Sequence, residues 1–337
     1  MKQDYIQLKK EISQYFRSRS IKDCFYVNSE CSGKIINAHS IQNNRCLSLL
    51  VERVNSNDGL YIFSKYFFKE NGNLQLELVG RNVASTFSGF CSFHDQTLFK
   101  VIDNNDFDYS SQQMFLYSYR AFAQMYHKKK EEFKGQHCDS VLRQKTEKDF
   151  WEDTTLGCNT TIRDIEKHRH TMNELFENHY YNQLDYFVYQ KKGLYPIASS
   201  GCVNLAFSPG GKENCSFFDL EQECFPLMIT VLPEVANTYV IIACFKNDIF
   251  HKALINELRF LFWDQVWIEK VISSILVFDM ENTCLSPYIW RKIDVLEQQQ
   301  LCDEICQSII PTINPYYFKS FNFSEINFFD PKFHKSI

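Results

Sequence analysis

The sequence predicts an α+β protein, because three successive stretches show three different patterns. Residues 1–108 combine two motifs of cysteine and histidine with short strand patterns. Residues 109–192 show the apolar spacing of two long helices. Residues 193–337 contain two strongly apolar strands followed by helices. We therefore expect an N-terminal metal-binding module (1–108), a long helical hairpin (109–192) and a C-terminal α/β domain (193–337).

The composition indicates a globular chain in a reducing compartment. The 337 residues are 45% hydrophobic and 23% charged, ordinary values for a soluble protein. Thirteen cysteines form an odd and scattered set, which favours reduced thiols over a disulfide framework. Because the sequence starts with polar residues, we expect no signal peptide. Because it has no run of eighteen apolar residues, we expect no membrane-spanning helix. We expect a cytoplasmic protein that does not bind membranes.

The first stretch opens with helical spacing over residues 4–19 and continues with a cysteine-flanked loop over residues 24–31. Ser32-Gly33 predicts a turn between two short strands. The remaining expected elements are a strand over 34–41, a short helix over 44–51, hairpin turns at 57–59 and 71–72, and a helix over 93–102.

The second and third stretches are read by the same rules. Apolar residues at helical spacing predict helices over 110–144 and 161–191, which would pair as an antiparallel hairpin. The near-continuous apolar runs 225–232 and 238–245 predict two central strands covered on both faces. Helices are expected over 249–261, 263–278 and 288–303, the last capped by Ser286 with Pro287 in its first turn.

Four residues of the first stretch form a candidate zinc site. Cys24 and Cys31 flank the turn, and Cys91 and His94 return later as a Cys-x2-His pair. Three thiols and one imidazole satisfy the tetrahedral demand of Zn²⁺, and four protein ligands make such a site structural. The six residues between Cys24 and Cys31 exceed the usual two to four. The alternative is that the cysteines are buried, unrelated and apolar in character.

The surroundings of these four residues resemble the HNH (ββα-metal, treble-clef) nuclease superfamily. The similar motifs are Ala38-His39-Ser-Ile41 and Gly89-Phe-Cys91-Ser-Phe-His94-Asp95, the latter continuing to Leu98-Phe99. The resemblance covers about the first third of the chain and implies a treble-clef fold. Two positions differ from the family pattern: Ala38 stands where a metal-binding Asp is common, and Asp95 where the family usually has His or Asn.

The resemblance also implies a chemistry. His39 would be the general base that deprotonates a water molecule, and Asp95 would be a carboxylate ligand for Mg²⁺ or Mn²⁺. Asn43, Asn44 or Asn82 would complete the site. The implied function is metal-dependent cleavage of DNA or RNA, by analogy in bacterial anti-phage defence. The net charge of −5 means that nucleic acid would have to meet a local basic patch.

Several alternatives stay open at this point. His39 could be structural, and the module could be catalytically silent and bind nucleic acid or a protein partner, including a second copy of the chain. His168 and His170 lie two residues apart on a helix, so they face different sides and do not predict a metal pair. Cys302 and Cys306 share a helix face and are expected in the core. No phosphate-binding loop, dinucleotide fingerprint or nucleophile elbow occurs.

Overall fold

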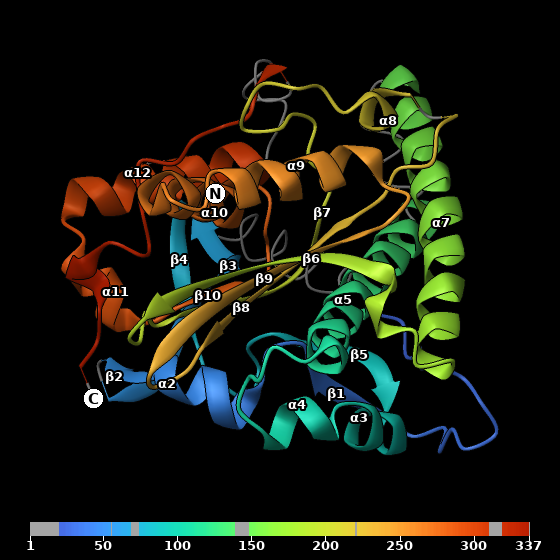
Figure 1. The fold of residues 1–337 in the computed structure, drawn as a ribbon, viewed down its shortest axis with the longest axis horizontal. Coiled ribbons are helices and arrows are strands. Elements are labelled where there is room, and N and C mark those ends of the chain that lie inside the picture. The colour runs from blue at the N-terminus through green and yellow to red at the C-terminus, as the bar shows by residue number, and fades with distance from the viewer. Residues whose placement is uncertain are drawn as a thin grey trace, which may run out of the picture.

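The computed structural model describes residues 20–54, 56–68, 74–138, 148–219, 221–309 and 319–336. The helix expected over 4–19 and the turn expected at 71–72 lie outside these residues. The described part is mixed α and β. It contains a small sheet of β1 (Ile35–His39) and β5 (Thr86–Cys91), and an eight-stranded sheet between two layers of helices (Figure 1).

The large sheet joins strands from both ends of the chain. Its order is β2-β3-β10-β7-β8-β9-β6, with β4 paired to β3, and every pairing among the described strands is antiparallel. The expected C-terminal α/β region is therefore an antiparallel sheet with helices. The strands are β2 (Glu52–Val54), β3 (Asn57–Phe68), β4 (Leu74–Val79), β6 (Leu184–Lys192), β7 (Ile197–Val203), β8 (Leu227–Pro233), β9 (Asn237–Phe245) and β10 (Thr283–Leu285).

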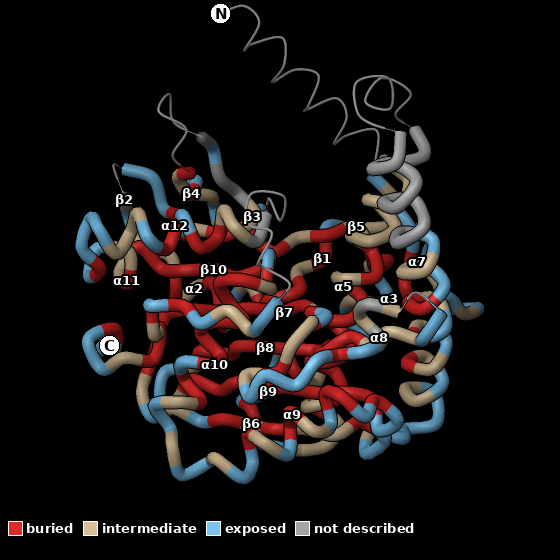
Figure 2. The backbone as a smooth tube through the Cα atoms, turned by 90° about the horizontal axis from the view of Figure 1, so that it is seen from above, coloured by how far each residue is buried: buried red, intermediate tan, exposed pale blue. Residues whose placement is uncertain are grey.

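Alternation along the central strands gives the sheet two buried faces, as expected for the two apolar runs. Ile229 and Val231 of β8 lie in one hydrophobic cluster, whereas their neighbours Met228 and Leu232 lie in another. The first cluster contains the helices α9 (Ile249–Phe260), α10 (Gln265–Phe278) and α12 (Val295–Ile309). The second contains α5 (Ser111–Cys138) and the N-terminal module. Buried residues accordingly run through the centre in Figure 2.

The remaining helices lie at the ends of the strands and beside α5. Helix α7 (Lys148–Glu177) packs along α5, which confirms two long neighbouring helices in this region (Figure 1). The short elements are η1 (Asn43–Leu47), α2 (Ser48–Leu50), α3 (Ser92–Leu98), α4 (Lys100–Asn104), η2 (Tyr181–Gln183), α8 (Cys215–Phe218), α11 (Pro287–Lys292) and η5 (Pro331–Phe333).

The end of the second long helix was predicted wrongly. The helical pattern extended to residue 191, but α7 ends at Glu177 and residues 184–192 form strand β6. His179 takes a φ of 57°, and the Tyr180 and His179 N–H groups donate to Leu175 O and Phe176 O. These two bonds are the Schellman arrangement that closes a helix, here with histidine in the position that usually holds glycine.

Two further boundaries also differ from the expectation. Residues 57–59 belong to β3, and the chain turns just before them, where Val54 pairs with Asn57 and Ser56 has a φ of 70°. The helix expected over 288–303 is divided into α11 and α12. Asp294 breaks it, because its carboxylate accepts hydrogen bonds from the N–H groups of Leu296 and Glu297.

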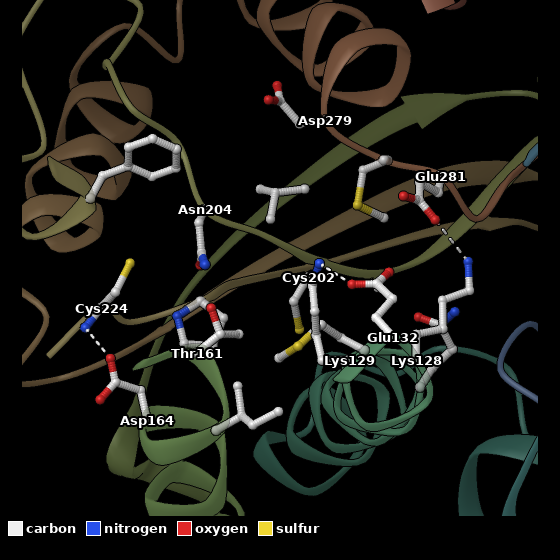
Figure 3. A pocket seen from close by; sticks show the side chains of 18 of the residues that line it. Lys128, Lys129, Glu132, Thr161, Asp164, Cys202, Asn204, Cys224, Asp279 and Glu281 are labelled. Carbon is white, nitrogen blue, oxygen red and sulfur yellow. Dashed lines mark hydrogen bonds and ion pairs between the residues drawn. The ribbon is translucent and has the colours of Figure 1, made fainter. Parts of the chain in front are cut away.

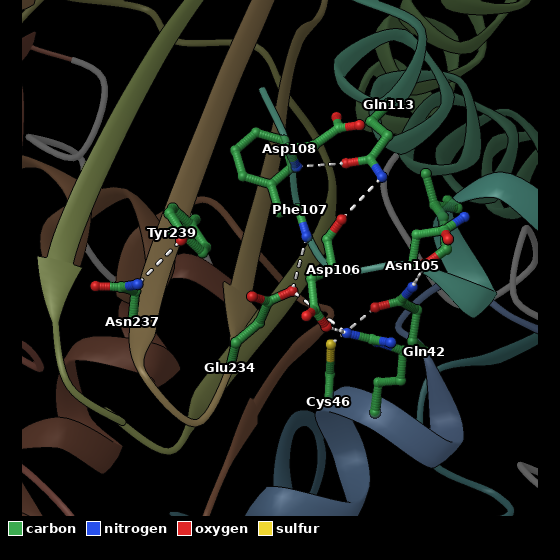
Figure 4. A network of polar contacts seen from close by, with 12 residues as sticks. Gln42, Cys46, Asn105, Asp106, Phe107, Asp108, Gln113, Glu234, Asn237 and Tyr239 are labelled. Atoms are coloured by element: carbon green, nitrogen blue, oxygen red, sulfur yellow. Dashed lines mark hydrogen bonds and ion pairs between the residues drawn. The ribbon is translucent and has the colours of Figure 1, made fainter. Parts of the chain in front are cut away.

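Polar contacts fasten the N-terminal module to the large sheet (Figure 4). The Phe107 N–H donates to Glu234 Oε1 at 3.1 Å, and Arg45 pairs with Asp106 and Glu234. Gln113 of α5 uses both ends of its amide: Oε1 accepts from the Asp108 N–H and Nε2 donates to Asp106 O, both at 2.9 Å.

None of the described helices has the length and apolar character needed to cross a bilayer.

Candidate metal centre

Two of the predicted ligands are placed by the junction between β5 and α3. Cys91 ends β5 and is the N-cap of α3, so its Sγ accepts a hydrogen bond from the His94 N–H at 3.4 Å. The cap fixes His94 in the first turn, on the same side as the thiol that precedes it. Both side chains are almost fully buried, with exposed fractions of 0% and 1%.

The other two ligands come from the loop before β1. The Phe25 N–H donates to Gly89 O at 2.7 Å, which lays Cys24 beside β5, and the Cys91 N–H points at Cys24 Sγ at 3.4 Å. The Cys31 N–H closes a turn onto Asn28 O at 3.2 Å. Gly33 then takes a φ of 69°, favoured by glycine, as the chain enters β1.

The four donor atoms converge on one point. The three Sγ atoms and the imidazole nitrogen of Cys24, Cys31, Cys91 and His94 all lie within 4.8 Å of one another, and Cys24 Sγ is 3.2 Å from His94 Nδ1. Tetrahedral zinc with bonds of about 2.3 Å to sulfur separates its sulfur ligands by roughly 3.8 Å. The donor set and its spacing thus fit a zinc ion, and the cysteines are free thiols. The predicted ligands are brought together.

The imidazole is held in the orientation that metal binding needs. His94 Nε2 lies 2.9 Å from Asn28 Oδ1, which can only accept a hydrogen bond. Nε2 therefore carries the proton, and the lone pair of Nδ1 faces the thiols. Metal-bound histidines usually have such a partner on their second nitrogen. Asn28 was not singled out in the sequence, although it lies inside the Cys24–Cys31 loop.

We expect Asn28→Ala to weaken zinc binding without abolishing it. Removing the acceptor frees the imidazole to rotate and lowers the basicity of Nδ1, and loss of such a partner typically costs about 10- to 100-fold in metal affinity. Competition with a zinc chelator measures the affinity. Asn44→Ala, at an exposed position of the same module, is the matched control and should leave the affinity unchanged. Equal affinities for the two variants would contradict the role given to Asn28.

The thiols differ in acidity. Burial raises the pKa of Cys24 to about 12. Burial acts in the same direction at Cys91, but hydrogen bonds from Ser32, from the His94 N–H and from Cys31 outweigh it and lower the pKa to about 7. Cys91 is thus the first of the two to lose its proton, and an incoming metal ion would meet one thiolate already formed.

His39, the predicted general base, lies at the end of β1 with both ring nitrogens engaged. Nδ1 is 3.1 Å from Ala84 O, and Nε2 is 3.2 Å from the Asn43 amide nitrogen. The amide nitrogen of Asn43 also donates to Asn82 Oδ1 at 3.2 Å. Burial lowers the pKa of His39, so the ring is neutral near pH 7. Of the candidate asparagines, Asn43 contacts His39 directly and Asn82 contacts Asn43.

Asp95, the predicted Mg²⁺ or Mn²⁺ ligand, lies near a buried guanidinium. Burial raises the pKa of Asp95, and the positive charge of Arg120 opposes that rise. Arg120 of α5 is only 3% exposed; it donates to both carboxylate oxygens of Asp103 at 2.9 and 2.8 Å and lies 4.0 Å above the Phe99 ring. A permanent cation therefore occupies the neighbourhood where the resemblance implies a divalent ion. The sequence showed no signal for Arg120, which lies on an apolar helix.

No second metal site accompanies the first one in the described part of the chain. The Cys₃His group is the single set of three or more His, Cys, Asp or Glu side chains there whose donor atoms lie close enough together. His168 and His170 do point apart: His168 is buried between the Phe225 and Phe245 rings with Nε2 2.9 Å from Glu223, and His170 is exposed. Cys302 belongs to the core, as predicted, and Cys306 is partly buried against it.

Known proteins give no independent indication of what the chain does. No protein-family model matches the sequence, and no curated protein and no solved structure is significantly similar to it. Any functional conclusion therefore depends on the geometry of the chain itself.

Proposed function

We propose that residues 24–104 contain a treble-clef-like zinc module whose metal is structural, and that the HNH-type reaction centre beside it is catalytically silent. In this proposal the loop with Cys24 and Cys31 and the start of α3 hold one zinc ion through four protein ligands. Such a site leaves no open position for substrate or water. The module would then serve as a binding element.

The proposal that the HNH-type centre is catalytically silent is supported by the surroundings of His39 and Asp95, the two residues that would carry out the reaction. His39 has hydrogen-bond partners on both nitrogens, so neither is free to take a proton from water. Asp95 is near Arg120 and Asp103, the charged groups that act on it. A guanidinium neutralises carboxylates but cannot polarise a phosphate or its leaving oxygen in the way a divalent ion does.

The binding partner of the silent module is proposed from the resemblance to HNH proteins, which favours nucleic acid. Exposed basic residues follow both ligand segments in the sequence: Lys34 follows the loop with Cys31, and Lys100 lies in α4, directly after α3. Binding of this kind would weaken steeply as the salt concentration rises. A protein partner is the alternative that a salt-insensitive complex would favour.

Nuclease activity of the HNH type is the second candidate. Its support is the neutral ring of His39, with Asn43 and Asn82 beside it, at the end of the strand that precedes the zinc helix. Small rearrangements on substrate binding tighten or release catalytic hydrogen bonds in many enzymes. The two candidates are separated by one experiment.

We expect wild-type protein to leave supercoiled plasmid intact in the presence of Mg²⁺ or Mn²⁺, and to leave single- and double-stranded RNA intact. We expect His39→Ala to keep about one zinc per chain, since His39 is not a ligand in this arrangement. Gel assays and metal analysis give the two readouts. Cutting by wild-type protein that falls by about 100-fold or more in His39→Ala would establish the nuclease and overturn the proposal of a silent centre.

A further inference from the structure

A second site lies between α5, α7 and the large sheet, away from the metal centre. Two adjoining cavities of about 440 and 320 Å³ open there. Figure 3 shows the larger one, with charged side chains of α5 and α7 on one side and the segment with Asp279 and Glu281 on the other. The two cavities share five lining residues: Gln124, Lys128, Glu132, Glu281 and Asn282.

Gln124 is a buried amide with unused hydrogen-bonding capacity. Its side chain is 5% exposed, and it makes no hydrogen bond to any described residue, yet it lines both cavities. A Cβ atom at Gly201 would lie 3.5 Å from its Oε1, so the absence of a side chain there leaves the amide uncovered. The polar atoms of the amide open onto the cavities and are not among the fully enclosed unpaired atoms of the described residues. A bound molecule would supply the missing partners.

Asn282 presents a second unused acceptor at the same place. Its Nδ2 donates to Ser40 Oγ at 2.8 Å and to Ser200 O at 2.6 Å, which fixes the orientation of the amide. Its Oδ1 accepts no hydrogen bond from any described residue, although the residue is only 5% exposed. Gln124 and Asn282 therefore offer one NH₂ group with two N–H donors and two acceptor oxygens where the cavities meet.

The charges around the larger cavity are predominantly negative. Five carboxylates and two lysines line it. Lys128 pairs with Glu281 at 3.1 Å and Lys129 with Glu132 at 2.9 Å, and Asp164 pairs with Arg163 beside the cavity at 2.7 Å. This surplus of carboxylates disfavours phosphate and other anions and favours ligands rich in donors such as hydroxyl and amino groups.

Apolar side chains supply another part of the lining, beside the uncharged polar residues Thr160, Thr161, Asn204 and Gln222. Met125 and Met280 line the cavity together with aliphatic side chains. The thioether of methionine packs favourably against aromatic rings, so these two residues suit an aromatic ligand. The apolar lining residues are Met125, Ile165, Val203, Phe217, Pro226 and Met280. A flat, apolar ligand with a hydrogen-bonding edge fits this combination, and a volume of a few hundred Å³ is usual for small-molecule sites.

We propose that this cavity binds an uncharged nucleoside whose base carries an exocyclic amino group, of the adenosine type. The carboxamide of Gln124 can accept from the amino group and donate to the adjacent ring nitrogen, the pairing that glutamine makes with adenine. Asn282 Oδ1 and the carboxylates accept from the remaining donors, including the ribose hydroxyls, and the thioethers contact the ring. This site does not depend on the zinc centre or on its proposed function.

Calorimetric titration of the full chain with adenosine tests the site, with adenosine monophosphate, an oligoadenylate and spermidine as comparisons. We expect adenosine to bind, and the two phosphate-bearing ligands to bind weaker by about tenfold or more, because phosphate would face the carboxylates. Equal or tighter binding of either phosphate-bearing ligand overturns the proposal. So does binding of spermidine without adenosine, which would identify a site for cationic amines.

The variant Gln124→Met separates recognition from folding, because it removes the amide and keeps the volume. We expect it to abolish adenosine binding without lowering the melting temperature of the free protein, since the amide makes no hydrogen bond to any described residue that the substitution would remove. Gln113→Met, on the same helix, removes an amide whose two hydrogen bonds are both made. It should lower the melting temperature and keep adenosine binding.

If Gln113→Met does not fold, Gln113→Glu serves as the control, because it keeps the acceptor for the Asp108 N–H. Adenosine binding that survives in Gln124→Met would overturn the assignment of Gln124. A lowered melting temperature in that variant would show that the amide is satisfied in the free protein, and would equally contradict the proposal.

Discussion

Replacing Cys91 by serine is expected to strip the zinc from the protein and unfold the N-terminal module. Serine is a poor zinc ligand at neutral pH, and the three remaining donors would bind the ion far more weakly. Structural zinc contributes apparent free energies of about 10 to 16 kcal/mol in small zinc-finger peptides. The loop with Cys24 and Cys31 has few backbone hydrogen bonds of its own, so its order depends largely on the metal and on contacts with α5 and α7, chief among them the aromatic anchor Phe25.

The packing of Phe25 indicates which parts of the protein would lose order together with the loop. Phe25 is 2% exposed and meets the rings of Phe90, Tyr119, Phe122 and Tyr126 edge to face, with centroids 5.2 to 6.0 Å apart. Release of the neighbouring Cys24 would loosen this packing against α5. We therefore expect an early melting transition of the module, ahead of the large sheet, visible by calorimetry, together with near-zero zinc by mass spectrometry.

Cys46→Ser is the matched control for Cys91→Ser. Cys46 is equally buried, at 1% exposed, lies in the same module and donates from Sγ to Gln42 Oε1 at 3.1 Å, but it is not a ligand. A serine hydroxyl can make the same hydrogen bond. The control should keep about one zinc per chain. A full equivalent of zinc and an unchanged melting profile in Cys91→Ser would refute the metal centre.

The second large effect is expected for Arg120→Leu. The guanidinium is 3% exposed and holds the Asp103 carboxylate by two hydrogen bonds, while its charge also acts on Asp95. Removing one member of a buried ion pair typically costs about 3 to 5 kcal/mol. The Asp103 side chain is 39% exposed and can turn to water, so we expect about 2 to 3 kcal/mol here. Urea unfolding measures the loss.

A double-mutant cycle tests whether the loss comes from the ion pair. Arg120→Leu combined with Asp103→Asn should recover part of the stability, since the carboxylate left without its partner is gone. The Arg120→Leu deficit should also shrink as the pH falls: without the guanidinium the pKa of Asp95 rises further, and protonation relieves the buried charge. Additive losses with no dependence on pH would contradict the role of the pair.

Part of the candidate metal site could be predicted because zinc-binding motifs are local in the sequence. A Cys-x2-His pair at the start of a helix brings two donors together whatever the rest of the fold, and only the pairing with Cys24 and Cys31 needed tertiary structure. The two apolar runs could be predicted as central strands for a similar reason. Their side chains are apolar at nearly every position, Thr230 and Thr238 being the exceptions, and β8 and β9 are buried on both faces.

Strand β6 could not be recognised in the same way. Leu184 and Phe187 are three residues apart and extend the helical spacing of α7, although both are buried from a strand. The decisive feature is the left-handed backbone of His179, a conformation that glycine marks in most sequences and histidine does not. Arg120, Gln124 and Asn282 were also missed, because the importance of each depends on partners far away in the chain.

The position of β10 has a consequence for how the protein is made. This three-residue strand pairs with β3 at Cys284–Ile62 and with β7 at Ala198, and so joins the N-terminal strands to the rest of the sheet. During synthesis, residues 283–285 leave the ribosome long after residue 62, and until then β3 and β7 expose unpaired edges. Such edges recruit other strands and promote aggregation. A nascent chain interrupted before residue 283 is therefore the form of this protein that most needs a chaperone.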